Sequence, residues 1–167
     1  LKVTGDVTVA KDVTSFTAKN TNFDTLTLNG GGTRSVVLED VTVKNLDVKA
    51  EVRVVIKGDL SEVKTLTVDA ADAKVEIEGK ASVEKLVANK AVTVTGADKI
   101  KTAEVNAANV GLDKAPKAIT GTKSPIIGGT EKSKEVVAAE VALTAYETAV
   151  KDLEAKKDSG DATFEAA

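Results

Sequence analysis

The side chains that most enzymes use for acid–base and nucleophilic chemistry are scarce in this sequence. It has no Cys and no His, which excludes the usual zinc sites, thiol nucleophiles and imidazole acid–base chemistry. Carboxylates remain, and they come close together in two places. Asp69 and Asp72 lie three residues apart, and Glu39 and Asp40 are adjacent. Because adjacent residues on a strand point to opposite faces, we expect the second pair to diverge unless it lies in a turn.

Calcium-dependent polysaccharide cleavage needs clustered carboxylates, usually with a basic residue beside them. Arg34 and Arg53 are the only arginines, and Asp59, Glu76 and Glu84 stand singly among lysines. We therefore interpret these carboxylates as a solvated surface. The sequence predicts no catalytic, cofactor-binding or metal-binding residue, and no enzyme.

A glycine run at Gly30 to Gly32 precedes Thr33 and Arg34. A phosphate-binding loop would continue with Lys and Ser or Thr and would open a helix, and neither feature follows here. Calcium-binding Gly-Gly-x-Gly-x-Asp repeats are also missing. The run is better explained as a long surface turn.

Regular Thr-x-Thr faces can order water on ice-binding proteins, and Thr25/Thr27 and Thr65/Thr67 fit that spacing at equivalent positions of a repeat. The equivalent positions of the other repeats break this face. They hold Asn45/Asp47, Lys85/Val87 and Thr102/Glu104. These threonines are typical outward-facing strand residues.

Aromatic platforms for sugar binding are also few. The aromatic residues are Phe16, Phe23, Tyr146 and Phe164. We assign Phe23 to a core and Tyr146 to an apolar helix stripe, which weakens the case for sugar binding without removing hydrogen-bonded recognition.

The elements that carry these residues follow a repeat. The pattern apolar-x-x-Leu-x-apolar starts at residues 23, 43, 63, 83 and, more weakly, 100. We call residues at the same position of successive repeats a column. The pattern predicts three inward columns, Phe23/Val43/Val63/Val83/Ile100, Leu26/Leu46/Leu66/Leu86/Ala103 and Leu28/Val48/Val68/Ala88/Val105. An outward column, Asp24/Lys44/Lys64/Glu84/Lys101, mixes both signs of charge.

Short apolar stretches precede most copies of this pattern, with Gly, Asp, Asn or Ala at the corners between strands. The stretches are Val36-Val37-Leu38, Val54-Val55-Ile56, Val75-Glu76-Ile77 and Val92-Thr93-Val94. A unit this small cannot bury its own apolar side, so units must stack, about 4.8 Å apart. The sequence predicts a mainly β fold, a parallel β-solenoid (β-helix) of about five short coils, in preference to a β-sandwich. The three-residue step from Val63 to Leu66 predicts a bend or a bulge.

The two ends of the chain follow other patterns. The glycine run upsets the phase of the first coil, whose register the sequence leaves open. We expect the solenoid at residues 1–120, a linker or end cap at 121–130 and a helical segment at 131–167. Thr130 or Ser133 is the predicted N-cap of a helix to about residue 157.

The helical segment carries a heptad-like apolar stripe, made of Val136, Ala139, Leu143, Tyr146, Val150 and Leu153. Ser159-Gly160 is a stop signal, and Asp161 is a candidate N-cap for a second, truncated helix. We expect an antiparallel helical hairpin, with a lone helix lying on the end of the solenoid as the alternative. Since the sequence begins at Leu1 and ends within this second helix, we expect a piece of a longer chain.

Charge and hydropathy limit the partners. The net charge is -3, which gives no electrostatic footprint for nucleic acid or an anionic membrane. No apolar run approaches the roughly 18 residues of a membrane span. The only expected partners are other domains of the same chain, further copies in lateral self-assembly, and cell-wall polysaccharide.

Residues 80–119 resemble a repeat of bacterial surface-layer proteins and of proteins that carry S-layer-homology domains. The matching segments are Ala81-Ser82-Val83-Glu84-Lys85-Leu86, Val92-Thr93-Val94-Thr95-Gly96, Ile100-Lys101-Thr102-Ala103-Glu104-Val105-Asn106-Ala107 and Val110-Gly111-Leu112-Asp113-Lys114-Ala115-Pro116. The segment Ala145-Tyr146-Glu147-Thr148-Ala149-Val150 is similar to helical spacers of such proteins. The resemblance implies an exported, extracellular protein of the cell surface or cell wall, and it brings no catalytic residues.

The expected function is a non-catalytic structural module of a bacterial surface protein, a rigid spacer or a display and assembly segment. Two alternatives stay open. The first is an adhesin or carbohydrate-binding solenoid, which the long Thr/Asn/Lys face suggests. The second is a fragment of a polysaccharide lyase whose catalytic coils lie upstream.

Overall fold

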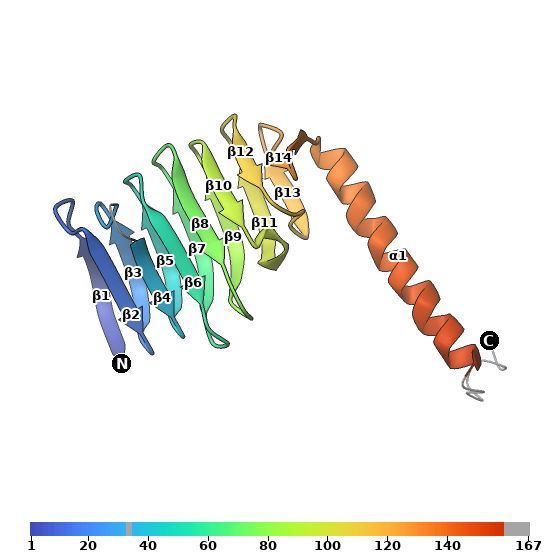
Figure 1. The fold of residues 1–167 in the computed structure, drawn as a ribbon, viewed down its shortest axis with the longest axis horizontal. Helices are drawn as coiled ribbons and strands as arrows, with labels where there is room; N and C mark the ends of the chain where they lie inside the picture. Colours follow the sequence, from blue (N-terminus) through green and yellow to red (C-terminus); the bar gives the residue numbers. More distant parts are fainter. Residues whose placement is uncertain (33–34, 159–167) are drawn as a thin grey trace.

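The structure is a computed structural model that describes residues 1–32 and 35–158. It is mainly β, a parallel β-solenoid of about six coils followed by a single helix. The solenoid forms an elongated body, and the helix leaves the last coil at the end opposite the N-terminus (Figure 1). The predicted fold class is confirmed.

Each coil contributes one odd-numbered strand to one sheet and one even-numbered strand to the other. The odd sheet consists of β1 (Lys2–Val9), β3 (Asn22–Leu28), β5 (Thr42–Val48), β7 (Glu62–Val68), β9 (Ser82–Ala88), β11 (Ile100–Val105) and β13 (Ala118–Gly121). The even sheet consists of β2 (Ser15–Lys19), β4 (Ser35–Glu39), β6 (Arg53–Lys57), β8 (Ala73–Ile77), β10 (Val92–Thr95), β12 (Val110–Leu112), β14 (Ile126–Ile127) and β15 (Thr130–Glu131). Among the described strands all pairing is parallel except that of β14 with β15.

The three inward columns of the odd sheet are confirmed residue by residue. Leu26 pairs with Leu46, Leu46 with Leu66 and Leu66 with Leu86, and the flanking columns keep the same register. All four of these leucines are fully buried. Burying an aliphatic side chain of this size contributes roughly 1.5–3 kcal/mol before the entropy of ordering it is subtracted.

A fourth inward column stands just before the odd strands. It consists of Thr21, Val41, Ser61 and Ala81, all buried. Two of the four are polar, which hides this column from a search for apolar periodicity.

The predicted irregularity between Val63 and Leu66 is a bend and not a bulge, because the paired strands have equal numbers of residues there. It consists of two consecutive residues that do not point into the core. Lys64 is exposed and Thr65 is half-buried, while Val63 and Leu66 are buried. The odd-sheet ladder passes from the Val43–Val63 pair directly to the Asn45–Thr65 pair. The irregularity recurs in the same place from coil to coil, so it stacks on itself and does not break the ladder.

The corner after an even strand is a left-handed turn. Asn20, Asp40, Gly58 and Gly96 follow β2, β4, β6 and β10, and all have positive φ angles, between 48° and 97°. Asn and Asp tolerate this conformation better than other side-chain-bearing residues, and Gly adopts it freely. The alternation of short strands with Asn, Asp and Gly therefore sets where each coil turns.

The even sheet differs from the simple alignment of its four apolar stretches. Val75 and Val92 each precede a glycine by four residues, so a simple alignment would pair these two valines. In the structure Val75 pairs with Val94 instead. Two residues further along both strands, Gly96 therefore lies against Ile77. A Cβ atom at Gly96 would lie 2.2 Å from the Ile77 carbonyl oxygen, so the corner needs a glycine there and the strand shifts by two residues to supply it.

The first coil, whose register the sequence left open, pairs Val7 with Leu26 and Val9 with Leu28. Its ladder shifts between Val3 and Asp6, where β1 has one more residue than β3, and Gly5 has a φ of 105°. This irregularity removes β1 from the 20-residue spacing of the coils that follow.

The last coil extends past residue 120. Strand β13 ends at Gly121, and the segment expected as a linker or end cap, residues 121–130, contains β14 and the start of β15. The antiparallel turn from Ile127 to Thr130 ends the parallel stacking of the even sheet.

Helix α1 (Lys134–Asp158) begins three residues after the end of β15. Of the two predicted caps, Ser133 is used: its hydroxyl accepts a hydrogen bond from the Val136 N–H at 3.4 Å. Val137 is fully buried and Val141 is half-buried against the solenoid core, whereas nearly all other described side chains of the helix are exposed. The expected second helix, from Asp161, lies outside the described residues.

Candidate functional site

The adjacent carboxylates Glu39 and Asp40 have separate structural roles. Glu39 points outward from β4 and forms ion pairs with Lys19 at 3.0 Å and Lys57 at 3.4 Å, in the coils on either side. These hydrogen-bonded ammonium groups lower the pKa of Glu39. Asp40 occupies the next corner, where its Oδ1 accepts a hydrogen bond from the Leu60 N–H at 3.2 Å. The two side chains do not form an acid–base pair.

Asp69 and Asp72 are likewise engaged with neighbouring coils. Asp69 Oδ1 accepts a hydrogen bond from the Asn89 side-chain amide at 2.8 Å, and Asn89 Oδ1 accepts one from Asn106 at 3.1 Å. Asp72 sits at a corner with a φ of 61°, and its N–H donates to the Ala91 carbonyl oxygen. The first residue belongs to a polar ladder along the solenoid, and the second forms a turn.

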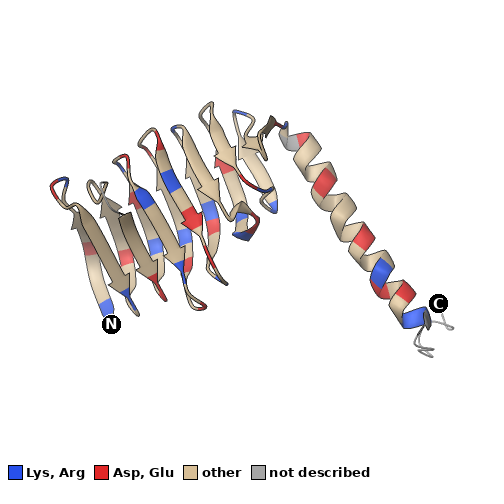
Figure 2. Ribbon diagram, viewed as in Figure 1, with Lys and Arg blue, Asp and Glu red and all other residues tan. Residues whose placement is uncertain are grey.

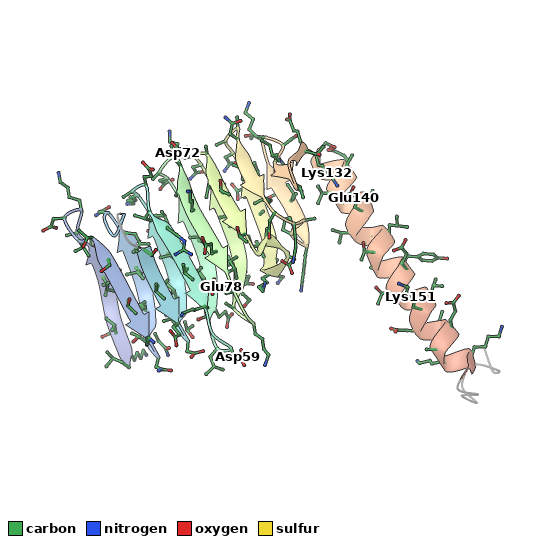
Figure 3. All side chains as sticks on the ribbon, viewed as in Figure 1. Asp59, Asp72, Glu78, Lys132, Glu140 and Lys151 are labelled. Atoms are coloured by element: carbon green, nitrogen blue, oxygen red, sulfur yellow. The ribbon has the colours of Figure 1, made fainter. Side chains whose placement is uncertain are left out.

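The isolated carboxylates form ion pairs with basic side chains of other coils. Glu76 accepts two hydrogen bonds from the Arg53 guanidinium, Asp59 pairs with Lys80 at 3.0 Å, and Glu84 pairs with Lys101 at 3.5 Å. In Figure 3, Asp72 lies at the upper corner of the solenoid, while Asp59 and Glu78 lie near the lower one. Figure 2 shows the same dispersal for the charged residues as a whole. The carboxylates do not converge on one point.

Arg53 links three coils of the even sheet. Besides Glu76 of β8, its guanidinium donates a hydrogen bond to the Ser35 hydroxyl of β4 at 3.1 Å. Hydrogen bonding to Glu76 raises the pKa of Arg53. The second arginine of the sequence, Arg34, lies outside the described residues.

The glycine run covers the corner between β1 and β2. A Cβ atom at Gly30 would lie 1.9 Å from the carbonyl oxygen of Ala10, and the Gly31 N–H donates to the Val13 carbonyl oxygen at 2.6 Å. Close backbone stacking explains why glycine occupies these positions. Thr33 and Arg34, which follow the run, are outside the described part of the chain.

The threonine pairs stack as the repeat predicts. Thr25 pairs with Asn45, which pairs with Thr65, and Thr27 pairs with Asp47, which pairs with Thr67. The later coils place Lys85/Val87 and Thr102/Glu104 in the same two columns. The threonine face is therefore broken between the two matching coils and in both coils that follow the second one.

The three aromatic residues that the structure describes form no joint platform. Phe23 is 6% exposed in the core, and Phe16 is half-buried against it. Tyr146, which the heptad pattern assigned to an apolar stripe, is 69% exposed. Phe164 lies outside the described residues.

Four carboxyl groups, those of Asp24, Glu39, Glu104 and Asp113, have a lowered pKa. Hydrogen bonds lower the pKa of Asp24 through Lys44, and that of Glu104 through Asn106 and Lys85. For Asp113, burial raises the pKa, but hydrogen bonds from the N–H groups of Gly96 and Ala97 outweigh it, so the net shift is downward. A general acid at neutral pH needs the opposite shift.

Two surface grooves among the described residues are candidate places for a ligand. One, of about 620 Å³, lies in the angle between the last coil and α1 and is lined by Ala115, Pro116, Val141, Leu143 and Thr144, among others. The other, of about 470 Å³, lies at the N-terminal ends of strands β7, β9 and β11 of the odd sheet. It is lined by Glu62, Ser82, Glu84, Lys99 and Lys101, among others.

Neither groove is a metal centre: residues 1–32 and 35–158 contain no cluster of three acidic side chains that could hold a metal ion. The same part of the chain has no helix with both the length and the apolar character that a membrane crossing needs. Comparison with protein-family models, with curated proteins and with solved structures gave no match.

Sequence reasoning missed two groups of residues with clear roles. Val137 and Val141 hold the helix to the solenoid. They were missed because the more regular apolar stripe, which begins at the neighbouring Val136, is the one that periodicity predicts as the buried face. Asp113 and Ser61 fix corners by accepting N–H groups from another coil. An isolated Asp or Ser near a corner gives little sequence signal, because its partner belongs to another repeat.

Proposed function

We propose that this chain is a non-catalytic structural module of a bacterial cell-surface protein of the surface-layer type. In this role the solenoid is a rigid spacer that displays neighbouring domains, or takes part in their assembly, at a set distance from the cell wall. It contributes length and stiffness, and no chemical step.

The observation that carries the proposal is the continuity of contacts along the solenoid axis. Apolar columns run from coil to coil without a gap in register. Outside them, polar side chains also bond along the axis, as in the Asp69–Asn89–Asn106 ladder and the Lys19–Glu39–Lys57 ladder. These charged and amide side chains join one coil to the next and do not gather around a ligand site. Such contacts along the axis are what a stiff rod requires.

The cell-surface location is supported by the resemblance of residues 80–119 to repeats of surface-layer proteins. An interspersed surface charge, with a net value of -3, suits a rod that must stay soluble beside its neighbours. Labelling of intact producing cells with an antibody to the solenoid tests this part. We expect labelling without permeabilisation, and labelling that needs permeabilised cells would contradict an extracellular location.

Removal of one whole coil tests the spacer role. Deleting residues 62–81 takes out β7 and β8 and joins Ser61 to Ser82, which keeps the 20-residue spacing of the odd strands. We expect a folded protein whose maximum dimension in small-angle scattering falls by about 4.8 Å, the spacing of one strand. A control deletion of ten residues, 62–71, removes half a coil and should unfold the protein. Equal loss of folding in both deletions would contradict a modular rod.

Carbohydrate binding is the second candidate, and the groove beside Lys99 and Lys101 favours it. Its lining offers ammonium, carboxylate and hydroxyl groups on one open face, which suits hydrogen-bonded recognition of a sugar. A glycan array of cell-wall and host polysaccharides tests it. Binding that is lost in Lys101→Ala and kept in Lys64→Ala would support the groove, and no binding to any glycan would remove this candidate.

A further inference from the structure

The apolar stripe of α1 lies open along the helix. Its larger members are exposed by 47% at Val136, 57% at Leu143, 69% at Tyr146 and 52% at Leu153. Isolated apolar residues on a surface need no explanation, but a row of them along one helix face marks an interaction site. The stripe was predicted as an internal contact, and the described part of the chain does not cover it.

The stripe follows a heptad. Val136, Leu143 and Val150 recur every seven residues at one position, and Ala139, Tyr146 and Leu153 recur every seven residues at the other. These are the a and d positions of a coiled coil. A β-branched residue at position a with Leu at position d favours two parallel strands, and Val150 with Leu153 meets that combination.

Most of the stripe faces away from the solenoid, and Leu143 also lines the groove beside the last coil. Successive residues of an α-helix turn by about 100°, which places the centre of the stripe about 170° around the helix from the centre of the Val137 and Val141 contact. The helix projects clear of the last coil (Figure 1). A second helix can therefore lie along the stripe while both solenoids stay on the outside of the pair.

The residues beside the stripe decide which pairing is possible. One flank carries Glu140, Glu147 and Glu154, and the other carries Glu135, Ala142, Ala149 and Lys156. Antiparallel pairing of two copies brings the glutamate flanks together, which is repulsive. Parallel pairing in register sets Ala142 and Ala149 of one copy opposite Glu147 and Glu154 of the other, so no like charges meet there.

The first glutamate is neutralised within its own chain. Glu140 accepts hydrogen bonds from the Lys132 ammonium at 2.6 and 2.8 Å. This ion pair offsets the approach of Glu135 of the second copy, which parallel pairing places beside Glu140. The charge pattern thus permits a parallel pair of identical helices and opposes an antiparallel one.

We propose that α1 pairs with α1 of a second copy of this chain as a parallel, in-register, two-stranded coiled coil. The proposal goes beyond the spacer function and does not rest on it, because it depends on the helix alone. The seam spans fewer than three full heptads, so the dimer is weak and its population rises with protein concentration.

Sedimentation equilibrium over about a hundredfold range of concentration tests the dimer. Tyr146→Glu places a charge in the seam, and Ala145→Glu places the same charge on the neighbouring exposed residue outside it. We expect the wild-type mass to rise toward that of a dimer, Ala145→Glu to match it, and Tyr146→Glu to associate at least about tenfold more weakly. A wild-type monomer at every concentration, or equal behaviour of the two variants, would overturn the proposal.

Disulfide cross-linking tests the orientation, because the sequence has no other cysteine. Parallel pairing brings the two copies of residue 153 within disulfide reach, so Leu153→Cys should cross-link readily under oxidation, whereas Ala145→Cys should not. Antiparallel pairing faces position a of one helix with position d of the other, so it would instead join Leu153→Cys to Val136→Cys in a mixture of the two variants. Preferential formation of that mixed dimer would overturn the parallel arrangement.

Discussion

The solenoid and helix α1 both carry apolar residues at regular spacing, but only the solenoid buries them. Leu66 is fully buried, with Leu46 on one side and Leu86 on the other. Leu143, in an equally regular pattern, is 57% exposed. A repeated coil supplies its own partner in the next coil, whereas a single helix must find its partner elsewhere. Apolar periodicity identifies a face, and the connectivity of the chain decides whether that face is covered.

The largest effect should come from the same substitution placed in each region. Leu66→Asp puts a carboxylate into a dry column where no cation can reach it, which costs about 5 kcal/mol or more and is comparable with the whole stability of a domain. Leu143→Asp leaves the charge in water and costs about 0.5 kcal/mol in helix propensity. Circular dichroism and urea melts of dilute protein should show an unfolded Leu66→Asp and a nearly wild-type Leu143→Asp.

Lys64→Ala is the control within the solenoid. Its side chain points outward two residues from Leu66, and its loss should change the free energy of unfolding by no more than about 0.5 kcal/mol. Melts in which Leu66→Asp and Leu143→Asp lose equal stability would remove the contrast between the two regions.

The odd sheet could be predicted closely from the sequence because each strand repeats a Leu between two apolar residues. That triplet fixes which residues are inward, and a spacing of 17 to 20 residues fixes which residues stack. The even sheet was less predictable. Its strands carry only two or three apolar residues, and a shift of two, as at Val94, keeps the same residues inward. Periodicity alone cannot distinguish the two registers.

The remaining differences have local causes. The extra residue at Gly5 and the glycine run at Gly30 gave the first coil a spacing of its own. For the helix, the sequence revealed the stripe but not the contact, because Val136 and Val137 are neighbours and only the last coil decides which one is buried. For the carboxylates, the sequence indicated that Glu39 and Asp40 diverge unless they lie in a turn, and the structure places Glu39 on β4 and Asp40 at the corner after it. The sequence could not name their partners, which lie about 20 residues away.

The junction between the regions offers a matched pair of valines. Val137 is fully buried against the solenoid, and Val136 is 47% exposed. Val137→Ala removes two methyl groups from a closed contact and should cost about 2 kcal/mol. Val136→Ala should stay within about 0.5 kcal/mol in dilute protein. Urea melts, with amide exchange of β13 as a local probe, measure both. Equal effects would mean that the helix is not fixed through this face.

A buried hydroxyl distinguishes polar from apolar stacking inside the solenoid. Ser61 Oγ accepts a hydrogen bond from the Val41 N–H at 3.1 Å and donates one to the Lys57 carbonyl oxygen at 2.6 Å. Ser61→Ala leaves the buried Val41 N–H without this acceptor and should cost about 1–2 kcal/mol. Alanine already occupies the same column at Ala81, so steric misfit is not the cause.

Ser82→Ala is the control for this prediction, since Ser82 is exposed at the start of β9 and should lose almost nothing. Thermal melts compare the two variants. A Ser61→Ala protein as stable as the wild type would show that the hydroxyl fills space in the column without stabilising the corner.

The smallest effect is expected at Asp113, where a carboxylate of one coil holds the corner of the coil before it. Its two oxygens accept the N–H groups of Gly96 and Ala97 at 2.9 and 3.0 Å, and these bonds lower its pKa below 3.8 despite partial burial. Its contribution to stability is therefore complete above pH 3.8 and disappears as the pH falls through the lower pKa of the folded state.

Asp113→Asn keeps the shape of the side chain but can offer only one acceptor oxygen. Because the side chain is largely exposed, this substitution should cost less than about 1 kcal/mol at neutral pH. Urea melts between neutral pH and pH 2 should show the difference from wild type shrinking only below about pH 3.8. A difference that stays constant across this range would mean that the charge of Asp113 does not hold the corner, and that the contacts between coils there are as insensitive to pH as the apolar columns.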